Sequence, residues 1–160
     1  MNIKKPLRGK SRKGFTLIEI LVVIGLIAIL AEIVLIAINP ARQFAQARNA
    51  QRTSNVNAIL NAIGQNIADN KGIFTCNATP FYIAATSTIK ASGGVDLRSC
   101  LVPAYLPEIP VDPSTGIAWT GSSYDTDYTV ATSTIGRYTV CASGGAEAAI
   151  SGSVAICVTR

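Results

Sequence analysis

Two acidic side chains lie inside the most apolar stretch of the sequence, which runs from Phe15 to Ile38. They are Glu19 and Glu32, and the rest of the stretch is apolar apart from one threonine and one glycine. A carboxylate at the centre of a membrane-spanning helix costs about 2.5 to 3.5 kcal/mol or more, so an acid at such a depth marks a functional site with a partner. The chemistry that such a carboxylate can perform is pairing with a positive charge in an apolar environment.

Five further carboxylates give no sign of catalysis. Glu108, Asp112, Asp125, Asp127 and Glu147 are scattered among residues expected in loops, at spacings that establish no acid and base pair. The sequence has no histidine and no recognisable nucleophile motif. We therefore predict that the chain is not an enzyme and uses no cofactor.

Asp125 and Asp127, together with Ser122 and Ser123, offer oxygen atoms to a calcium ion. Calcium needs six to eight oxygen ligands, and a solvated polar turn uses the same residue types. We predict no metal site and keep the two aspartates as weak calcium candidates.

The four cysteines contain no CxxC pair, which argues against zinc or thioredoxin-like chemistry. An even number of cysteines beyond a membrane segment indicates disulfide bonds formed in an oxidising compartment. We expect two bridges, and four cysteines permit three pairings.

A helix from Phe15 to Ile38 would rise roughly 36 Å, enough to span a bilayer. Basic residues and no acidic ones precede it, so we expect a cytoplasmic amino terminus and a translocated remainder. Removal of residues 1–14 takes six of the 14 Lys and Arg and none of the nine Asp and Glu, which turns a net charge of +5 into −1. The basic character is therefore topogenic, and we predict no nucleic-acid partner.

The segment from Lys13 to Glu19, KGFTLIE, followed by the apolar run, closely resembles the class III signal of type IV prepilins and of type II secretion pseudopilins. The resemblance covers residues 1 to about 68. It implies that a membrane-embedded prepilin peptidase cuts after Gly14 and methylates the new amino terminus at Phe15. Glu19 matches the family residue that neutralises the terminal amine of a neighbouring subunit during assembly.

The same resemblance implies the partners and the location of the chain. The partners are other copies of the chain in a helical filament, the peptidase and methyltransferase, the inner-membrane assembly machinery, and membrane lipid before assembly. The chain is expected in the bacterial inner membrane first and in a cell-surface filament afterwards.

Glu32 departs from the minimal family signature. It is displaced by about 220° from Glu19 around a helix, so the two carboxylates cannot serve one site in the same subunit. Two interpretations stand side by side. Glu32 reaches the polar headgroups at the membrane boundary, or it pairs with Arg42 or Arg48 of another subunit in a filament.

The sequence predicts four segments: a basic leader at 1–14, a membrane and filament-core helix at 15–39, an amphipathic second half of this helix at 40–68, and a head at 69–160. Pro40 interrupts the helical pattern and predicts a kink or a short melted stretch. The second half carries an apolar stripe that needs a cover, with polar residues opposite. The stripe consists of Val56, Ile59, Leu60, Ile63 and Ile67, and the polar residues are Arg52, Asn57, Asn61 and Gln65.

The head is expected to cover the stripe with a small antiparallel sheet. Strands are predicted at 128–132, 137–142 and 153–159, with a hairpin turn at 133–136 and a weaker strand signal at 81–88. The proline-rich segment 101–116 is expected to be extended and rich in turns. The fold class is α+β, with the type IV pilin fold: a long kinked helix on an antiparallel sheet.

We favour the disulfides Cys76–Cys100 and Cys141–Cys157 among the three pairings. Pairing of neighbours closes local loops, and the family often ties down its carboxyl-terminal region in this way. Each bridge would contribute about 3 kcal/mol of stability.

Among function classes, a structural subunit of a type IV pilus explains Gly14, Phe15 and Glu19 together. A major pseudopilin of a type II secretion system is the alternative: the proline-rich loop favours the pseudopilin, whereas the head with two disulfides favours the pilin. A monomeric membrane-anchored binding protein would explain the apolar segment alone.

Overall fold

The structure is a computed structural model that describes residues 14–83 and 85–160, with Ile36 and Ala37 described by their backbone only. Apart from Gly14, the predicted leader lies outside these residues. The chain divides into two compact units that meet between Asn39 and Pro40, and each is described by itself.

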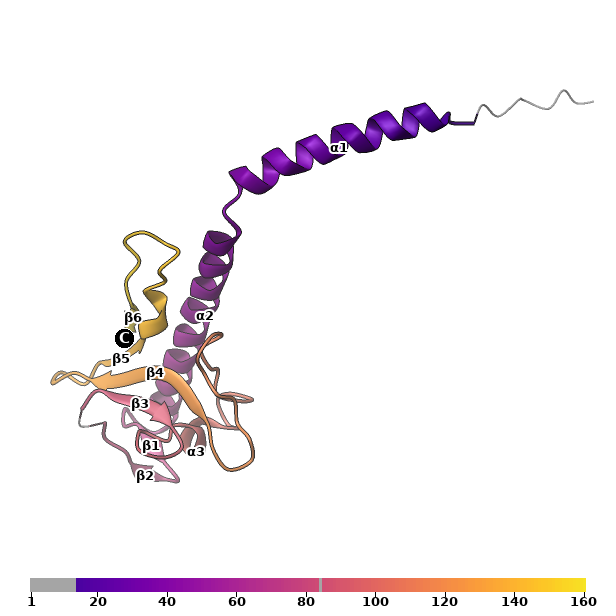
Figure 1. Cartoon of the computed structure of the whole chain (residues 1–160). Helices are drawn as coiled ribbons and strands as arrows, with labels where there is room; N and C mark the ends of the chain where they lie inside the picture. The colour runs from indigo at the N-terminus through magenta and orange to yellow at the C-terminus, as the bar shows by residue number, and fades with distance from the viewer. Residues whose placement is uncertain (1–13, 84) are drawn as a thin grey trace, which may run out of the picture. The chain divides into compact units, whose positions relative to one another are not determined.

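The first unit contains the helix α1 (Leu17–Ala37). It is the indigo helix next to the amino terminus in Figure 1. Its residues 17–35 are apolar enough and long enough to cross a membrane, with a mean hydropathy of 2.8. Every one of these side chains is exposed in the single chain. Within the described residues, nothing covers the apolar surface of α1.

A helix break lies where the sequence predicts an interruption. Ile38 follows α1 with extended backbone angles, and its N–H group donates to the carbonyl of Val34. The next helix, α2 (Pro40–Asp69), begins at the proline itself. Proline suits the first position of a helix because its fixed φ fits and its missing N–H group would have no helical partner there. The interruption is thus a short non-helical link at Ile38 and Asn39.

The second unit packs α2 against a four-stranded antiparallel sheet in the order β3-β4-β5-β6 (Figure 1). Its strands are β3 (Ser87–Lys90), β4 (Asp125–Thr132), β5 (Tyr138–Ala142) and β6 (Ile156–Thr159). A small hairpin of β1 (Thr75–Cys76) and β2 (Thr79–Pro80), the short helix α3 (Arg98–Leu101) and the 3-10 turn η1 (Ser143–Gly145) complete it. This is an α+β architecture, consistent with the pilin fold expected from the sequence.

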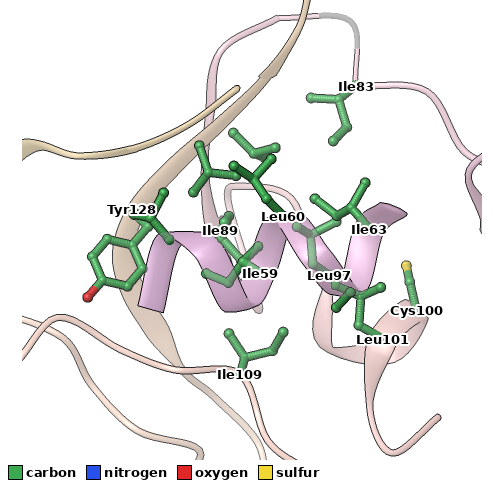
Figure 2. Packing of buried hydrophobic residues seen from close by; sticks show 14 of the residues in the cluster. Ile59, Leu60, Ile63, Ile83, Ile89, Leu97, Cys100, Leu101, Ile109 and Tyr128 are labelled. Atoms are coloured by element: carbon green, nitrogen blue, oxygen red, sulfur yellow. The ribbon is translucent and has the colours of Figure 1, made fainter. Parts of the chain in front are cut away.

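The core lies between the stripe of α2 and one face of the sheet. Val56, Ile59, Leu60 and Ile63 are at most 2% exposed, and Ile67 packs against them. Figure 2 shows Tyr128 and Ile89 of the sheet, Leu97 and Leu101 around α3, and Ile109 of the proline-rich loop close to α2. The apolar stripe predicted on α2 is therefore the stripe that the head covers.

Several details of the head differ from the sequence prediction. The weak strand expected at 81–88 is replaced by β3, which begins only at Ser87. The hairpin β1–β2 and helix α3 were not expected, because elements of two to four residues have too short a pattern to be read. Segment 102–116 contains no strand, in agreement with its prolines.

Candidate functional site

The amino-terminal segment from Gly14 to Glu19 carries the residues predicted for processing and assembly. Gly14, Phe15 and Thr16 lie outside the helix, and α1 begins only at Leu17. The Phe15 side chain is 85% exposed. The peptide bond between Gly14 and Phe15 is therefore in an accessible, non-helical stretch directly before a helix.

Glu19 takes part in a capping box with Thr16. Its Oε2 atom accepts hydrogen bonds from the Thr16 backbone N–H and hydroxyl group, each at 2.8 Å. In return, the Glu19 N–H donates to the Thr16 hydroxyl oxygen at 3.3 Å. This motif satisfies two helix N–H groups that have no partner within the helix. Sequence reasoning missed it, although a threonine three residues before a glutamate at the start of an apolar run is its signature.

The capping box leaves one oxygen of the Glu19 carboxylate unused. Both bonds from Thr16 end on Oε2, whereas Oε1 accepts no hydrogen bond from the part of the chain that the structure describes. The carboxylate therefore caps its own helix and still presents an acceptor to a cation from outside.

A second cluster, which we call the Arg52 network, lies in the head and was not predicted. Arg52 is placed by α2, Asp112 and Ser114 by the proline-rich loop, and Glu147 by the segment after η1. Arg52 donates to both carboxylate oxygens of Asp112, with Nε–Oδ2 at 2.6 Å and Nη2–Oδ1 at 3.0 Å. It also donates to the Ser114 hydroxyl at 2.7 Å and to Oε1 of Glu147 at 2.5 Å.

This cluster corrects the prediction that Arg52 belongs to the polar face of α2. The side chains of Arg52 and Asp112 are 1% and 0% exposed. The helical pattern assigned Arg52 to the solvent because it is charged, but two loops fold over that part of the helix and bring carboxylates to it. A guanidinium group is buried without excessive cost when carboxylates take up its donors in this way.

The hydrogen bonds keep both acids ionised. Burial by itself raises the pKa of Asp112, but the hydrogen bonds from Arg52, Ser114 and Thr115 outweigh it and hold this pKa well below its usual range. Hydrogen bonds from Arg48 and then Arg52 lower the pKa of Glu147 from 4.5 to about 2. The network is therefore charged at any pH near neutrality.

Arg48 and Gly144 complete the network. Arg48 contacts Glu147 through two hydrogen bonds of 2.7 Å. A methyl group on Gly144 would lie 2.9 Å from Nη2 of Arg52 and 3.0 Å from Oδ2 of Asp112, so only glycine fits there without a shift. The Arg52 network joins α2, the proline-rich loop and the segment before β6 into one body.

The two disulfides join Cys76 to Cys100 and Cys141 to Cys157, which is the pairing favoured from the sequence. They differ in their surroundings. Cys76 and Cys100 are both buried at 9% exposure and link β1 to α3. Cys141 and Cys157 are directly opposed residues of β5 and β6, and Cys157 is exposed.

The weak calcium candidates lie at the start of β4. The Asp125 carboxylate accepts the N–H group of Asp127, and the Asp127 carboxylate accepts the Thr115 hydroxyl at 2.5 Å. Within the described residues, no group of three or more His, Cys, Asp or Glu side chains is placed to hold a metal ion. The first bond lies within β4, and the second links β4 to the proline-rich loop.

Comparison with known proteins finds one match, at the amino terminus. Residues 9–31 match the family model of the prokaryotic N-terminal methylation motif. The chain thus carries the class III signal of type IV pilins and pseudopilins, on an α+β fold with a long apolar helix, a small antiparallel sheet and two disulfides. No curated protein and no solved structure matches the chain.

Proposed function

We propose that the chain is a structural subunit of a type IV pilus, assembled by packing of α1 helices after cleavage by the prepilin peptidase. The observation that carries the proposal is the combination of the methylation motif with a fully exposed apolar helix. Such a helix is stable in a membrane or against identical helices, and the motif is the signal that directs a chain from the first state to the second.

In this proposal the peptidase cuts between Gly14 and Phe15 and a methyl group is added to the amine of Phe15. The accessible, non-helical segment before α1 supports the cleavage. After cleavage, Thr16 and Glu19 remain in the mature chain, so the capping box of α1 is kept. The only new charge is the terminal amine of Phe15, just before α1, which has no basic residue; the first basic residue of the mature chain is Arg42, in α2.

The free Oε1 atom of Glu19 is the proposed acceptor for the amine of an incoming subunit. The attraction between two unit charges at 4 Å is about 4 kcal/mol at an effective dielectric of 20, and desolvation of both groups cancels much of it. The pair therefore selects subunits and sets their register, while apolar contacts of α1 supply the bulk of the stability. The chain would lie in the inner membrane before assembly and in a surface filament afterwards.

The test is the intact mass of the chain purified from the cells that make it. The expected mass corresponds to loss of residues 1–14 plus one methyl group. Gly14→Val should block cleavage and filament formation, because the larger side chain precedes the scissile bond, whereas the control Gly9→Val in the leader should be processed. A wild-type chain that retains Met1 would overturn the proposal.

A major pseudopilin is the second candidate, favoured by the strand-free proline-rich segment at 102–116. Deletion of the gene separates the two functions. Loss of surface filaments with normal export of secreted enzymes supports the pilus subunit, and accumulation of those enzymes in the periplasm supports the pseudopilin. A processed chain that stays monomeric would instead indicate an anchored binding protein.

A further inference from the structure

Glu32 is the one membrane-helix carboxylate that the proposed function leaves without a role. It lies within the apolar stretch Leu17–Leu35 of α1 and is exposed in the single chain. It makes no hydrogen bond or ion pair with any of the described residues. It is thus an ionisable side chain on an apolar surface with no partner among the described residues of its own copy.

The surroundings of Glu32 change when the chain leaves the membrane. Glu32 is three residues from Leu35, where the candidate span ends, so while the helix is in the bilayer the carboxylate lies toward the headgroup region and not at the bilayer centre. In a fibre of packed α1 helices there are no headgroups. The carboxylate then needs a cation from protein, because burial of an unpaired charge is strongly unfavourable.

The structure narrows the choice of cations. Arg52 is buried and Arg48 is half-buried, and both are held in the head by Glu147 and Asp112, so neither presents its guanidinium group to a neighbour as fully as an exposed arginine does. The remaining basic residues of the mature chain, Lys71 and beyond, follow the end of α2, which at 30 residues is about 45 Å long. Arg42 is exposed in the first turn of α2 and is the basic residue closest in sequence to the apolar stretch.

The pairing considered is between copies. Glu32 lies in α1 and Arg42 in α2, and Glu32 makes no ion pair with the described residues of its own copy. The contact that Arg42 makes in its own copy does not exclude a second one, because a guanidinium group has five N–H donors.

We infer that Glu32 of one copy forms an ion pair with Arg42 of a neighbouring copy in the filament, a second charge contact distinct from the one at Glu19. This inference rests on the proposed function, because it requires a fibre of packed α1 helices. The partner it names is another copy of this chain, recognised through a carboxylate and a guanidinium group that are both exposed in the single chain.

The first test exchanges the charges of Glu32 and Arg42 by substitution, in cells that lack a wild-type copy of the gene. Glu32→Arg and Arg42→Glu should each lower the yield of sheared filaments about tenfold or more, because each leaves like charges facing one another. The double variant Glu32→Arg with Arg42→Glu should restore the yield to within about threefold of the wild type. Equal amounts of each processed chain in the membrane fraction show that insertion and folding are intact.

Cross-linking of filaments is the second test and does not depend on yield. Arg42→Lys keeps the charge and supplies an amine, which a carbodiimide couples to a carboxylate in contact with it, with loss of water. The expected product is a covalent dimer whose cross-linked peptide contains Glu32. The matched control, Arg42→Lys with Glu32→Gln, should give no such peptide.

Failure of the proposed function and failure of the Glu32–Arg42 ion pair give different results. If the wild-type chain forms no filaments, the proposed function is wrong. If the wild type forms filaments but charge exchange restores nothing and the cross-linked peptide lacks Glu32, the function stands and this ion pair is overturned.

Discussion

Nε of Arg52 lies 2.6 Å from Oδ2 of Asp112, although 60 positions separate the two residues in the chain. The second bond of the pair, from Nη2 to Oδ1, makes the contact bidentate. A helix residue and a loop residue are thus held in one fixed geometry without water access. The proline-rich loop forms no strand along 102–116, and this pair anchors it to α2 together with the Asn55 amide, which donates to the Val111 carbonyl.

Replacement of Arg52 by alanine should therefore destabilise the head severely. The change leaves Asp112 buried with only the Ser114 and Thr115 donors, and loss of one partner of a buried pair costs about 3 to 5 kcal/mol. Urea unfolding of the full chain in detergent, followed by near-ultraviolet circular dichroism, measures the free energy. Glu108→Gln is the control, because its pair with Arg98 is exposed and should be worth about 1 kcal/mol or less. Equal effects of the two variants would contradict the role of the Arg52 network.

The stability of the head should fall in acid over a defined range. Asp112 and Glu147 have lowered pKa values in the folded chain, so the unfolded chain binds protons first as the pH decreases. Their contribution is fully present above pH 4.5 and for Glu147 is lost as the pH falls from 4.5 to about 2. Unfolding free energies measured at pH 7, 4 and 3 should decrease in that order.

A variant of Glu147 tests whether this residue causes the loss of stability in acid. Glu147→Gln removes the titrating group but keeps an oxygen that accepts from Arg48 and Arg52. It should be less stable than the wild type at pH 7 and should lose less further stability between pH 4 and pH 3. A loss identical to that of the wild type would show that other carboxylates cause the acid sensitivity.

The two tasks of Glu19 can be separated with variants of the capping box. Glu19→Gln keeps a side chain that accepts from Thr16 but removes the charge, whereas Thr16→Ala removes the cap at a cost of about 1 kcal/mol and keeps the charge. We expect no filaments from Glu19→Gln and filaments in reduced amount from Thr16→Ala. Sheared filaments are quantified in strains without a wild-type copy. Normal filaments from Glu19→Gln would leave apolar packing of α1 as the only driving force.

The disulfides should differ in their reaction with a reductant. Cys141 and Cys157 lie in neighbouring strands with Cys157 exposed, while Cys76 and Cys100 are buried between β1 and α3. Brief treatment of the folded chain with a phosphine at low concentration, followed by alkylation, should label Cys141 and Cys157 first. Peptide mass spectrometry gives the order. Equal labelling of all four would show that the head opens before either bond is reduced.

The sequence was sufficient for the parts of the fold that repeat a simple pattern. The apolar run of α1, the stripe on α2 and the strands around the turn at 133–136 each extend over enough residues for a period to be recognised. Pro40 marked the helix boundary because a missing N–H group has the same consequence in any fold. The amino-terminal signal was recognisable because its residues act in a fixed order along the chain.

The Arg52 network could not be predicted for the opposite reason. Its members come from three separate segments, and nothing in the residues around Asp112 or Glu147 indicates which arginine they contact. Only the tertiary packing of two irregular loops on α2 brings them together. A local signal exists for one part of it: Asp112, two residues before Ser114, is the acceptor of an Asx turn, which predicts a fixed loop but not its cation.

The segment between Glu147 and Ser153 is a loop whose two ends are hydrogen-bonded to each other and whose middle residues are exposed. The Glu147 carbonyl accepts from the Ser153 hydroxyl and the Ile150 N–H, while its carboxylate is held by Arg48 and Arg52. Ser151 and Gly152, at the tip, are exposed. The contacts that fix this loop are therefore at its ends and not at Ser151 and Gly152. A foreign peptide inserted between these two residues should leave the sheet undisturbed.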